Sequence, residues 1–381
     1  MAGIYIHIPF CGQFCTYCNF YSVKGGAYRE KFIQALQKEI YLKKNRTEGV
    51  STVYFGGGTP SVLSVPVLHE ILDAVKNAFG AAGDGSPVEI TIEVNPDDIT
   101  PEYAKGLKAA GFNRVSMGVQ SFIDEHLKWM NRRHRADDAV NSCILLREAG
   151  FENISLDLIF GYSRLNDRQW EYNLHRLIAL SPEHISAYQM SVEPGSRLSL
   201  LLRRGEYTLP DDSVCAAQYE KLQQMLAGAG YAQYEVSNFA REGFRSRHNS
   251  SYWNKSPYLG FGPSAHSFNG KSRYWNTDSI KRYCAYYLAC DAPFSMEDLS
   301  AHAGGFEILS GEDIFHESLM LGLRTVEGVD LSTLDAELLA VVMPRIKRQI
   351  RLGNLVLRDN RYITIPAGKL FVSDSIIREL F

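Results

Sequence analysis

Short β-rich runs alternate with amphipathic helical stretches through the first half of the chain, and this alternation restricts the fold more than any other feature. Between the runs, apolar residues recur at helical spacing, as at Phe32, Leu36 and Ile40. Repeated strand–helix units form a parallel sheet with right-handed crossovers. Six units are too few for a closed eight-stranded barrel, so we expect an α/β fold with a partial, open (β/α)6 barrel; an open doubly wound sheet is the alternative. The β-rich runs lie at residues 3–8, 52–55, 88–94, 114–119, 154–159 and 184–188.

The pattern changes after about residue 195, so residues 1–195 are expected to form the partial barrel and residues 196–300 an extension of it. Within the extension, residues 198–207 read as a mixed linker. Residues 233–275 are rich in Gly, Ser, Asn, His and aromatic side chains, a composition more typical of a binding loop than of a core element.

Residues 301–381 are expected to form a separate C-terminal domain. Helical stretches there are followed by β-like pieces at 355–358 and 362–365, with a turn at Asp359 and Asn360. Helices followed by a hairpin predict a small helical, winged-helix-like domain.

Composition excludes several classes of protein. The chain has 381 residues, 45% of them hydrophobic, and a formal net charge of -3, whereas a protein built mainly to bind nucleic acid usually has a basic excess. No apolar run approaches the about 18 residues of a membrane span, and no basic export signal precedes the first strand. We therefore expect a soluble, cytoplasmic protein with no nucleic-acid partner and no transmembrane segment. The sequence does not fix the oligomeric state, and a homodimer is one possible assembly.

Three of the seven cysteines, Cys11, Cys15 and Cys18, crowd into eight residues directly after the first expected strand. An odd number of cysteines without an export signal does not indicate a disulfide framework. A structural zinc site needs four ligands, and no fourth Cys or His lies nearby at the usual spacing. An ordinary [4Fe–4S] cluster also takes four cysteines, so three would leave one iron open for a substrate or cofactor. The spacing favours the cluster, with zinc as the alternative.

Polar side chains share one face on three consecutive expected strands. Glu93, Ser116, Gln120 and Asp157 alternate with apolar neighbours that face the other way. Barrel sites are built at the carboxyl ends of strands, where these residues lie. The triplet at 56–58, Gly-Gly-Gly, lets the backbone approach a ligand and would offer free N–H groups to a carboxylate or amine. We expect a ligand site there; the alternatives are a hydrated interior without a ligand and a simple tight turn.

The cysteine loop, in the form Cys11-x3-Cys15-Thr-Tyr17-Cys18, is similar to the signature of the radical S-adenosylmethionine (radical SAM) superfamily. Other segments resemble one branch of that superfamily, the oxygen-independent coproporphyrinogen oxidases and the related HemW-type heme chaperones. The resemblance covers nearly the whole chain. The matching segments are Tyr5-Ile-His-Ile-Pro-Phe-Cys11, Phe55-Gly-Gly-Gly-Thr-Pro60, Glu93-Val-Asn-Pro96, Ser116-Met-Gly-Val-Gln-Ser121, Asp157-Leu-Ile-Phe-Gly161, His248-Asn-Ser-Ser-Tyr-Trp253 and Gly260-Phe-Gly-Pro-Ser-Ala-His266.

The resemblance implies the cofactors and the residues that hold them. Cys11, Cys15 and Cys18 would carry a [4Fe–4S] cluster, and the amino and carboxylate groups of S-adenosylmethionine would fill the open iron site. The residues implied to line the S-adenosylmethionine site are Tyr5, Tyr17, Gly57, Gly58, Thr59, Glu93, Gln120, Arg132 and Asp157.

Two features separate this chain from the coproporphyrinogen oxidases that it resembles. Their signature continues with a further cysteine where this chain has Phe20, and they carry a long N-terminal arm, whereas ten residues precede Cys11 here. The HemW-type branch shares the aromatic residue and the short N-terminus. The resemblance therefore implies a heme chaperone that hands heme to acceptor proteins such as respiratory enzymes and lacks coproporphyrinogen III oxidase activity. The alternatives are that oxidase, in porphyrin biosynthesis, and a zinc-stabilised interaction module.

His248 is the heme ligand that the resemblance implies, and imidazole is a common axial donor to heme iron. Nearby arginines would meet heme propionates through charge-assisted hydrogen bonds, and nearby aromatic rings would cover the macrocycle. His266 and His7 are the rival ligands. The surrounding residues are Arg241, Arg245, Arg247, Tyr252, Trp253 and Trp275.

Overall fold

The computed structural model describes residues 2–44, 46–47, 49–80, 88–291 and 294–381. Its main feature is a 12-stranded sheet in which six parallel strands lie side by side in chain order. Every crossover therefore steps in the same direction, whereas a doubly wound sheet reverses its direction at a switch point. The predicted partial, open (β/α)6 barrel is confirmed, and the doubly wound alternative is wrong. The six strands are β1 (Ala2–Ile8), β4 (Val50–Gly57), β5 (Glu89–Val94), β6 (Arg114–Gln120), β7 (Ile154–Phe160) and β8 (His184–Gln189).

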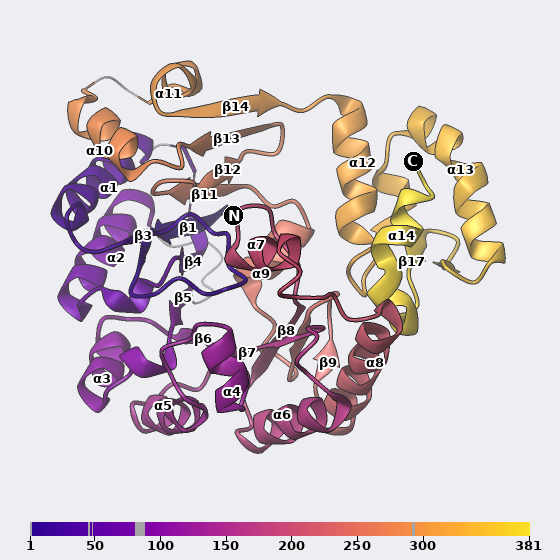
Figure 1. Ribbon diagram of the computed structural model, residues 1–381. Helices are drawn as coiled ribbons and strands as arrows, with labels where there is room; N and C mark the ends of the chain where they lie inside the picture. Colours follow the sequence, from indigo (N-terminus) through magenta and orange to yellow (C-terminus); the bar gives the residue numbers. More distant parts are fainter. Residues whose placement is uncertain (1, 45, 48, 81–87, 292–293) are drawn as a thin grey trace.

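Helices follow the parallel strands and form an outer layer around them (Figure 1). In α2, Leu68, Ile71 and Val75 recur at helical spacing and are buried, as expected for a helix that covers a sheet. On β1, Ile4 is buried beneath this layer, while the next residue, Tyr5, lines the barrel interior. Across the described residues, no helix combines the length and the apolar content needed to cross a membrane. The helices of the layer are α1 (Arg29–Lys43), α2 (Val65–Phe79), α3 (Pro101–Ala109), α5 (Ala136–Glu148), α6 (Asp167–Ala179) and α8 (Asp212–Gly228), whereas the short α4 (Asp124–Trp129) ends beside the cysteine loop.

Short strands from the later part of the chain extend the sheet at both edges. The expectation that residues 233–275 form mainly a binding loop is wrong, because most of these strands come from that stretch. Its aromatic residues, such as Phe239 and Phe261, are buried as strand residues, and strands of two to five residues are too short to show a period of two in the sequence. At one edge β11 (Tyr258–Phe261) pairs in parallel with β1 and is followed by β12 (His266–Phe268), β13 (Ser272–Asn276) and β14 (Gly304–Ile308); at the other, β10 (Asn238–Ala240) and β9 (Ala232–Gln233) follow β8.

The prediction of a linker at residues 198–207 is also wrong, because most of these residues lie in helix α7 (Arg197–Arg203). The Ser196 hydroxyl caps this helix by accepting a hydrogen bond from the backbone N–H of Ser199. Three further helices, α9 (Arg247–Trp253), α10 (Ile280–Ala289) and α11 (Met296–His302), connect the edge strands. Two short strands, β2 (Phe10–Cys11) and β3 (Val23–Lys24), pair with each other at the two ends of the cysteine loop.

The C-terminal elements form a small helical unit with a three-stranded sheet, beside α8 in Figure 1. Asp359 and Asn360 take positive φ angles of 53° and 51° between β16 and β17, as a two-residue hairpin turn requires. Helices followed by a hairpin are therefore present as predicted. The elements are α12 (Gly311–Gly322), β15 (Val329–Asp330), α13 (Ala336–Arg351), β16 (Val356–Arg358), β17 (Tyr362–Thr364) and α14 (Ser373–Arg378).

A buried ion pair ties α1 to the elements that follow β11. Lys43 donates a hydrogen bond of 2.5 Å to the Glu39 carboxylate, and the two side chains are 1% and 0% exposed. Tyr283 and Tyr287 of α10 donate their hydroxyl hydrogens to the same carboxylate, at 2.6 and 3.0 Å. Asn276 of β13 donates to it as well, at 2.8 Å. These donors satisfy the lone pairs of a carboxylate that has lost its water, which a buried pair needs in order to be stable.

Replacing one partner of this ion pair should lower the free energy of unfolding more than replacing both partners. Lys43→Met and Glu39→Gln should each lower the free energy of unfolding by about 3–5 kcal/mol, because each leaves one buried charge uncompensated. The double substitution should cost less than the sum. Urea unfolding measures all three, with Lys38→Met, whose ion pair with Asp291 is at the surface, as a control that loses less than about 1 kcal/mol. Additive losses would show that the two charges do not depend on each other.

Candidate functional site

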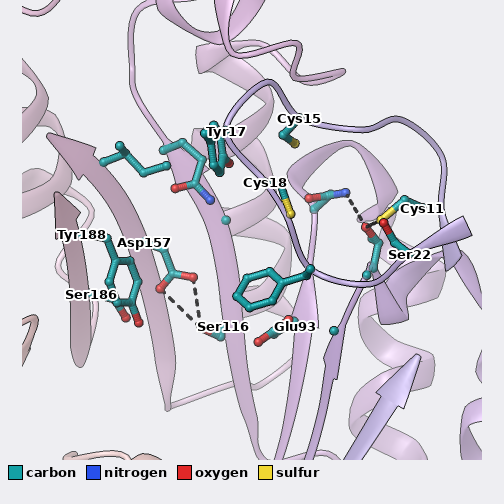
Figure 2. Close-up of a pocket in the computed structure, with 18 of the residues that line it drawn as sticks. Cys11, Cys15, Tyr17, Cys18, Ser22, Glu93, Ser116, Asp157, Ser186 and Tyr188 are labelled. Carbon is teal, nitrogen blue, oxygen red and sulfur yellow. Dashed lines mark hydrogen bonds between the residues drawn. The ribbon is translucent and has the colours of Figure 1, made fainter. Parts of the chain in front are cut away.

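A cavity of about 1290 Å³ extends from the carboxyl ends of the parallel strands into the barrel interior. Figure 2 shows the three cysteines of the loop above Glu93, Ser116 and Asp157 on the strands. The tertiary structure brings together every residue that the sequence predicted for the site. The residues that line this cavity include Tyr5, Cys11, Cys15, Tyr17, Cys18, Gly57, Gly58, Thr59, Glu93, Gln120, Arg132, Asp157 and His248.

The strand faces bring two carboxyl groups into the cavity, as the alternation predicted. Glu93 of β5 lies beside Ser116 of β6, whose hydroxyl donates to both oxygens of Asp157 on β7 at 3.4 Å. Burial raises the pKa of Glu93 to about 7, against hydrogen bonds from Tyr54 and from the backbone of Gly57. Burial also raises the pKa of Asp157. Both groups can therefore be protonated, and donate hydrogen bonds, at a pH where free carboxyls are charged.

The cysteine loop is anchored to the barrel at several points. The backbone N–H and the hydroxyl of Thr16 donate to the carbonyls of Met130 and Trp129, at 2.9 and 3.0 Å. The Cys11 Sγ lies 3.5 Å from the Thr59 hydroxyl, and the Arg132 guanidinium donates to the Cys15 Sγ at 3.4 Å. These contacts hold the loop over the cavity.

The donor set of this loop fits an iron–sulfur cluster. Cys11, Cys15 and Cys18 are unpaired thiols, each partly exposed and each lining the cavity. Burial raises the pKa of the Cys18 thiol to about 11, so deprotonation there needs a compensating cation such as a metal centre. Among the described residues no three His, Cys, Asp or Glu side chains stand close enough to hold a single metal ion. Three thiols suit a cluster with one open iron, whereas a closed structural zinc site takes four protein ligands.

Arg132 is held between the loop and the strands. Its guanidinium donates to the Asn95 side chain and to the Gly118 carbonyl, both at 2.7 Å, in addition to Cys15. Gln120, at the end of β6, takes a φ of 67° next to a register shift between Gly118 and Gln120. A non-glycine residue in this conformation is strained, and such strain is concentrated at binding sites.

Two glycines of the triplet line the cavity, but not all of the N–H groups in this segment are free as expected. The N–H groups of Gly58 and Thr59 are not free for a ligand, because they donate to the carbonyls of Ile8 and Phe10 at 2.8 Å. Gly57 takes a φ of 106°, and a Cβ at this position would lie 2.6 Å from the His7 ring. The glycines therefore allow the start of the cysteine loop to pack against the end of β4.

His248 lies at the opposite end of the cavity from the cysteine loop. It is 2% exposed and near Gly3, at the start of β1. Its Nδ1 is 2.8 Å from the Thr52 hydroxyl, and its Nε2 is 2.9 Å from the Tyr252 hydroxyl. Burial lowers the pKa of His248 to about 3, with a contribution from Arg114. Both ring nitrogens therefore already have hydrogen-bond partners in this conformation.

Two of the arginines that precede His248 have partners elsewhere. Arg245 pairs with Glu327 at 2.5 Å, and Arg241 donates to the Ser181 hydroxyl at 2.7 Å. Among the rival histidines, His7 is buried and contacts the Tyr21 carbonyl through Nε2 at 2.9 Å, whereas His266 is exposed.

Sequence reasoning missed several cavity residues that alternation along the strands could have found. Tyr54 shares the inner face of β4 with Gly56 and donates to Glu93 at 2.7 Å. Arg114, the first residue of β6, shares the inner face with Ser116 and also lines the cavity. The two-residue alternation that identified Glu93 would also have placed both of these side chains on the inner faces of their strands.

A partial (β/α)6 barrel with three cysteines in the loop after its first strand is the arrangement of the radical SAM class of proteins. The sequence profile described as "Radical SAM superfamily" matches residues 5–177, and the profile described as "HemN C-terminal domain" matches residues 309–371. A solved structure of coproporphyrinogen III oxidase (HemN) from Escherichia coli has the same fold, with a TM-score of 0.81 and 22% identity, covering 100% of this chain and 89% of that one.

Similar sequences identify the family more specifically than the fold does. A protein named heme chaperone HemW from Mycobacterium tuberculosis is 33% identical over 99% of this chain and 94% of its own length. A protein of the same name from Bacillus subtilis is 37% identical over 86% of this chain and 85% of its own. The chain therefore belongs to the HemW family within the radical SAM superfamily.

A methyl group at Gly58 should disturb the cysteine loop. The Cβ would lie 2.8 and 2.9 Å from the Phe10 and Ile8 carbonyl oxygens and 3.1 Å from the Cys11 Sγ. Because the obstacle is mainly backbone, Gly58→Ala should lower the free energy of unfolding by about 1–3 kcal/mol. Gly26→Ala is the matched control, since nothing lies within 4 Å of its Cβ. Equal unfolding curves for the two variants would mean that the loop adapts without cost.

Proposed function

We propose that this protein is a heme chaperone that carries a [4Fe–4S] cluster and S-adenosylmethionine in its barrel and delivers heme to acceptor proteins. The observation that carries the proposal is the identity with proteins named heme chaperone HemW over 94% of the length of one such relative. The exposed side chain of Phe20, which lines the cavity beside the cysteine loop, supports it. The coproporphyrinogen oxidases that the chain resembles carry a thiol at that position.

Cys11, Cys15 and Cys18 would hold the cluster, and the S-adenosylmethionine would lie over the inner strand faces. Glu93 and Asp157 are placed to hydrogen-bond a ligand there, and Arg132 holds the loop by its bond to Cys15. Tyr5, Tyr17, Gln120, Gly57, Gly58 and Thr59 complete the proposed lining. When bound, such a cluster supplies one-electron chemistry to the S-adenosylmethionine.

Further parts of the proposal concern the setting in which the protein works. We propose acceptors such as respiratory enzymes, a cytoplasmic location, and a homodimer as one assembly to be tested. We also propose the barrel, extension and C-terminal domain as three units. The last boundary is best moved from residue 300 to after residue 308, because β14 pairs with β13 in the large sheet.

The cluster is tested by its iron and sulfide. Anaerobically purified protein should contain about four iron and four sulfide per chain. Serine at Cys11, Cys15 or Cys18 should abolish the broad thiolate-to-iron absorption, whereas Cys290→Ser should leave it unchanged. Stoichiometric zinc without acid-labile sulfide would instead favour the zinc-stabilised module.

Two assays on one preparation of the protein distinguish the chaperone role from the oxidase role. Cluster-loaded protein should bind hemin with a shifted Soret band and pass it to an apo-globin in excess. The same protein, given reductant and S-adenosylmethionine, should leave coproporphyrinogen III unchanged because Phe20 has no thiol. Multiple-turnover decarboxylation would overturn the chaperone proposal in favour of the oxidase.

The proposed ligation of heme iron by His248 requires local rearrangement. Either the Tyr252 or the Thr52 hydrogen bond must break before a ring nitrogen can reach iron. His248 is also buried, so the segment around α9 would have to open.

Freeing one nitrogen should therefore help ligation. Tyr252→Phe removes the partner of Nε2 and should raise the affinity for hemin, followed by the Soret shift, about fivefold, the worth of one neutral hydrogen bond of about 1 kcal/mol. His248→Ala should remove the shift, while His7→Ala and His266→Ala serve as controls. An unaltered spectrum for His248→Ala would make this segment structural, and a loss with His266→Ala would move the ligand to the exposed histidine.

A further inference from the structure

Arg114 is a buried cation without a hydrogen-bonding partner. It is 2% exposed, it begins β6, and it lines the cavity. Its Nε is buried and makes no hydrogen bond. Within the part of the chain that the structure describes, no carboxylate lies within 4.0 Å of its guanidinium, and no residue accepts a hydrogen bond from it. A guanidinium withdrawn from water in this way is costly unless something pairs with it.

The groups near Arg114 do not replace such a partner. Arg114 attracts Glu93 and Asp157 at longer range, but burial has the larger effect on both carboxyls and raises the pKa of each. The nitrogens of His184 are bonded to the Ser155 and Tyr234 hydroxyls, at 2.7 and 2.8 Å. Those of His248 are bonded in the same way to two other hydroxyls. Both histidines have pKa values lowered by burial and by Arg114, so they are neutral neighbours.

Two other arginines, Arg132 and Arg147, have hydrogen-bond or ion-pair partners. Arg132, at the other end of the same cavity, donates to three different groups. Arg147 pairs with Glu183 at 2.8 Å. Arg114 therefore differs from them in having an open guanidinium that faces a cavity.

A second unsatisfied group stands beside Arg114. Thr91 of β5 is its register partner, and the Thr91 hydroxyl is buried without a hydrogen-bond partner. Two neighbouring groups, one cationic and one a hydroxyl, are thus both unsatisfied at the same level of the barrel. A guanidinium offers parallel N–H donors that match the two oxygens of a carboxylate.

Arg114 lies at the far end of the cavity from Gln120, and Glu93 and Asp157 of the proposed cofactor site lie at levels between the two. Arg114 begins β6, whereas Gln120 ends it at the carboxyl side. Six residues of strand span about 20 Å at about 3.3 Å per residue. One cavity connects the two ends.

We propose that the deep end of the barrel is a second binding site, for a carboxylate group that Arg114 receives. The carboxylate belongs either to a small free acid or to the acidic arm of a larger molecule that enters through the cavity mouth. This site does not depend on the chaperone role, since its chemistry rests on Arg114 alone.

The direct test uses the full-length, cluster-loaded protein without substitution. Crystals soaked in 3-bromopropionate should show an anomalous bromine peak in the deep end of the cavity, with the carboxylate on Arg114. In solution, Arg114→Gln should weaken 3-bromopropionate binding at least tenfold by calorimetry. Arg197→Gln, at an exposed arginine that lines the same cavity, should bind as the unsubstituted protein does. If Arg114→Gln does not fold, Arg114→Lys keeps the charge, loses the paired donors, and should still weaken binding.

A second experiment distinguishes the two possible sources of the carboxylate. Hemin and hemin dimethyl ester are titrated into the unsubstituted protein and into Arg114→Gln. A preference for the free acid that Arg114→Gln abolishes assigns the site to the acidic arm of a larger ligand. Binding of 3-bromopropionate without such a preference assigns it to a small acid. The proposal is overturned if neither probe depends on Arg114, or if the bromine peak lies elsewhere. Failure of heme binding alone would contradict the chaperone role and leave the bromopropionate result to decide this site.

Discussion

The two-residue alternation along six parallel strands is the constraint on which the rest of this structure depends. Outward-facing side chains such as Ile4 and Ile6 are buried beneath helices, so they are apolar. Inward-facing side chains are not covered by the outer helices, and a chain with only six such strands does not fill its interior with side chains as an eight-stranded barrel does. The interior is therefore left as a polar cavity with a mouth at the carboxyl ends of the strands. Cys11, Cys15 and Cys18 lie at that mouth because the first strand ends there.

The same arrangement determines the electrostatics of the cavity. Removal from water disfavours the charged form of each group, so burial raises the pKa of Glu93 to about 7 and lowers that of His248 to about 3. A carboxyl and an imidazole held neutral act through hydrogen bonds more than through charge. Arg132 and Arg114 both line this polar space and differ in their partners: Arg132 is bonded to the loop and the strands, whereas the Arg114 Nε has no hydrogen-bond acceptor among the described residues.

Much of the fold and of the candidate site was predictable from the sequence, because both depend on local patterns. The strands around Glu93, Ser116 and Asp157 show a clear period of two, so the face that each residue shares could be read directly. The predictions for residues 198–207 and 233–275 were wrong because α7 has only seven residues and strands such as β12 and β10 only three. Segments of that length are stabilised by the sheet edge or the helix on which they pack, and they carry too few residues to show a period.

The sequence by itself determined the order of strand–helix units, the inner and outer faces of each strand, and three thiols at one strand end. These follow from spacing along one chain, which needs no knowledge of distant contacts. Only the tertiary structure decided which groups satisfy one another across that chain. It bonded both nitrogens of His248 to Thr52 and Tyr252, and it bonded the N–H groups of Gly58 and Thr59 to the cysteine loop. Among the described residues, it also left the buried Nε of Arg114 without a hydrogen-bond acceptor. Hydrogen-bond satisfaction in a buried space depends on which residues meet there, and residues as far apart as Thr52 and His248 meet only when the sheet forms.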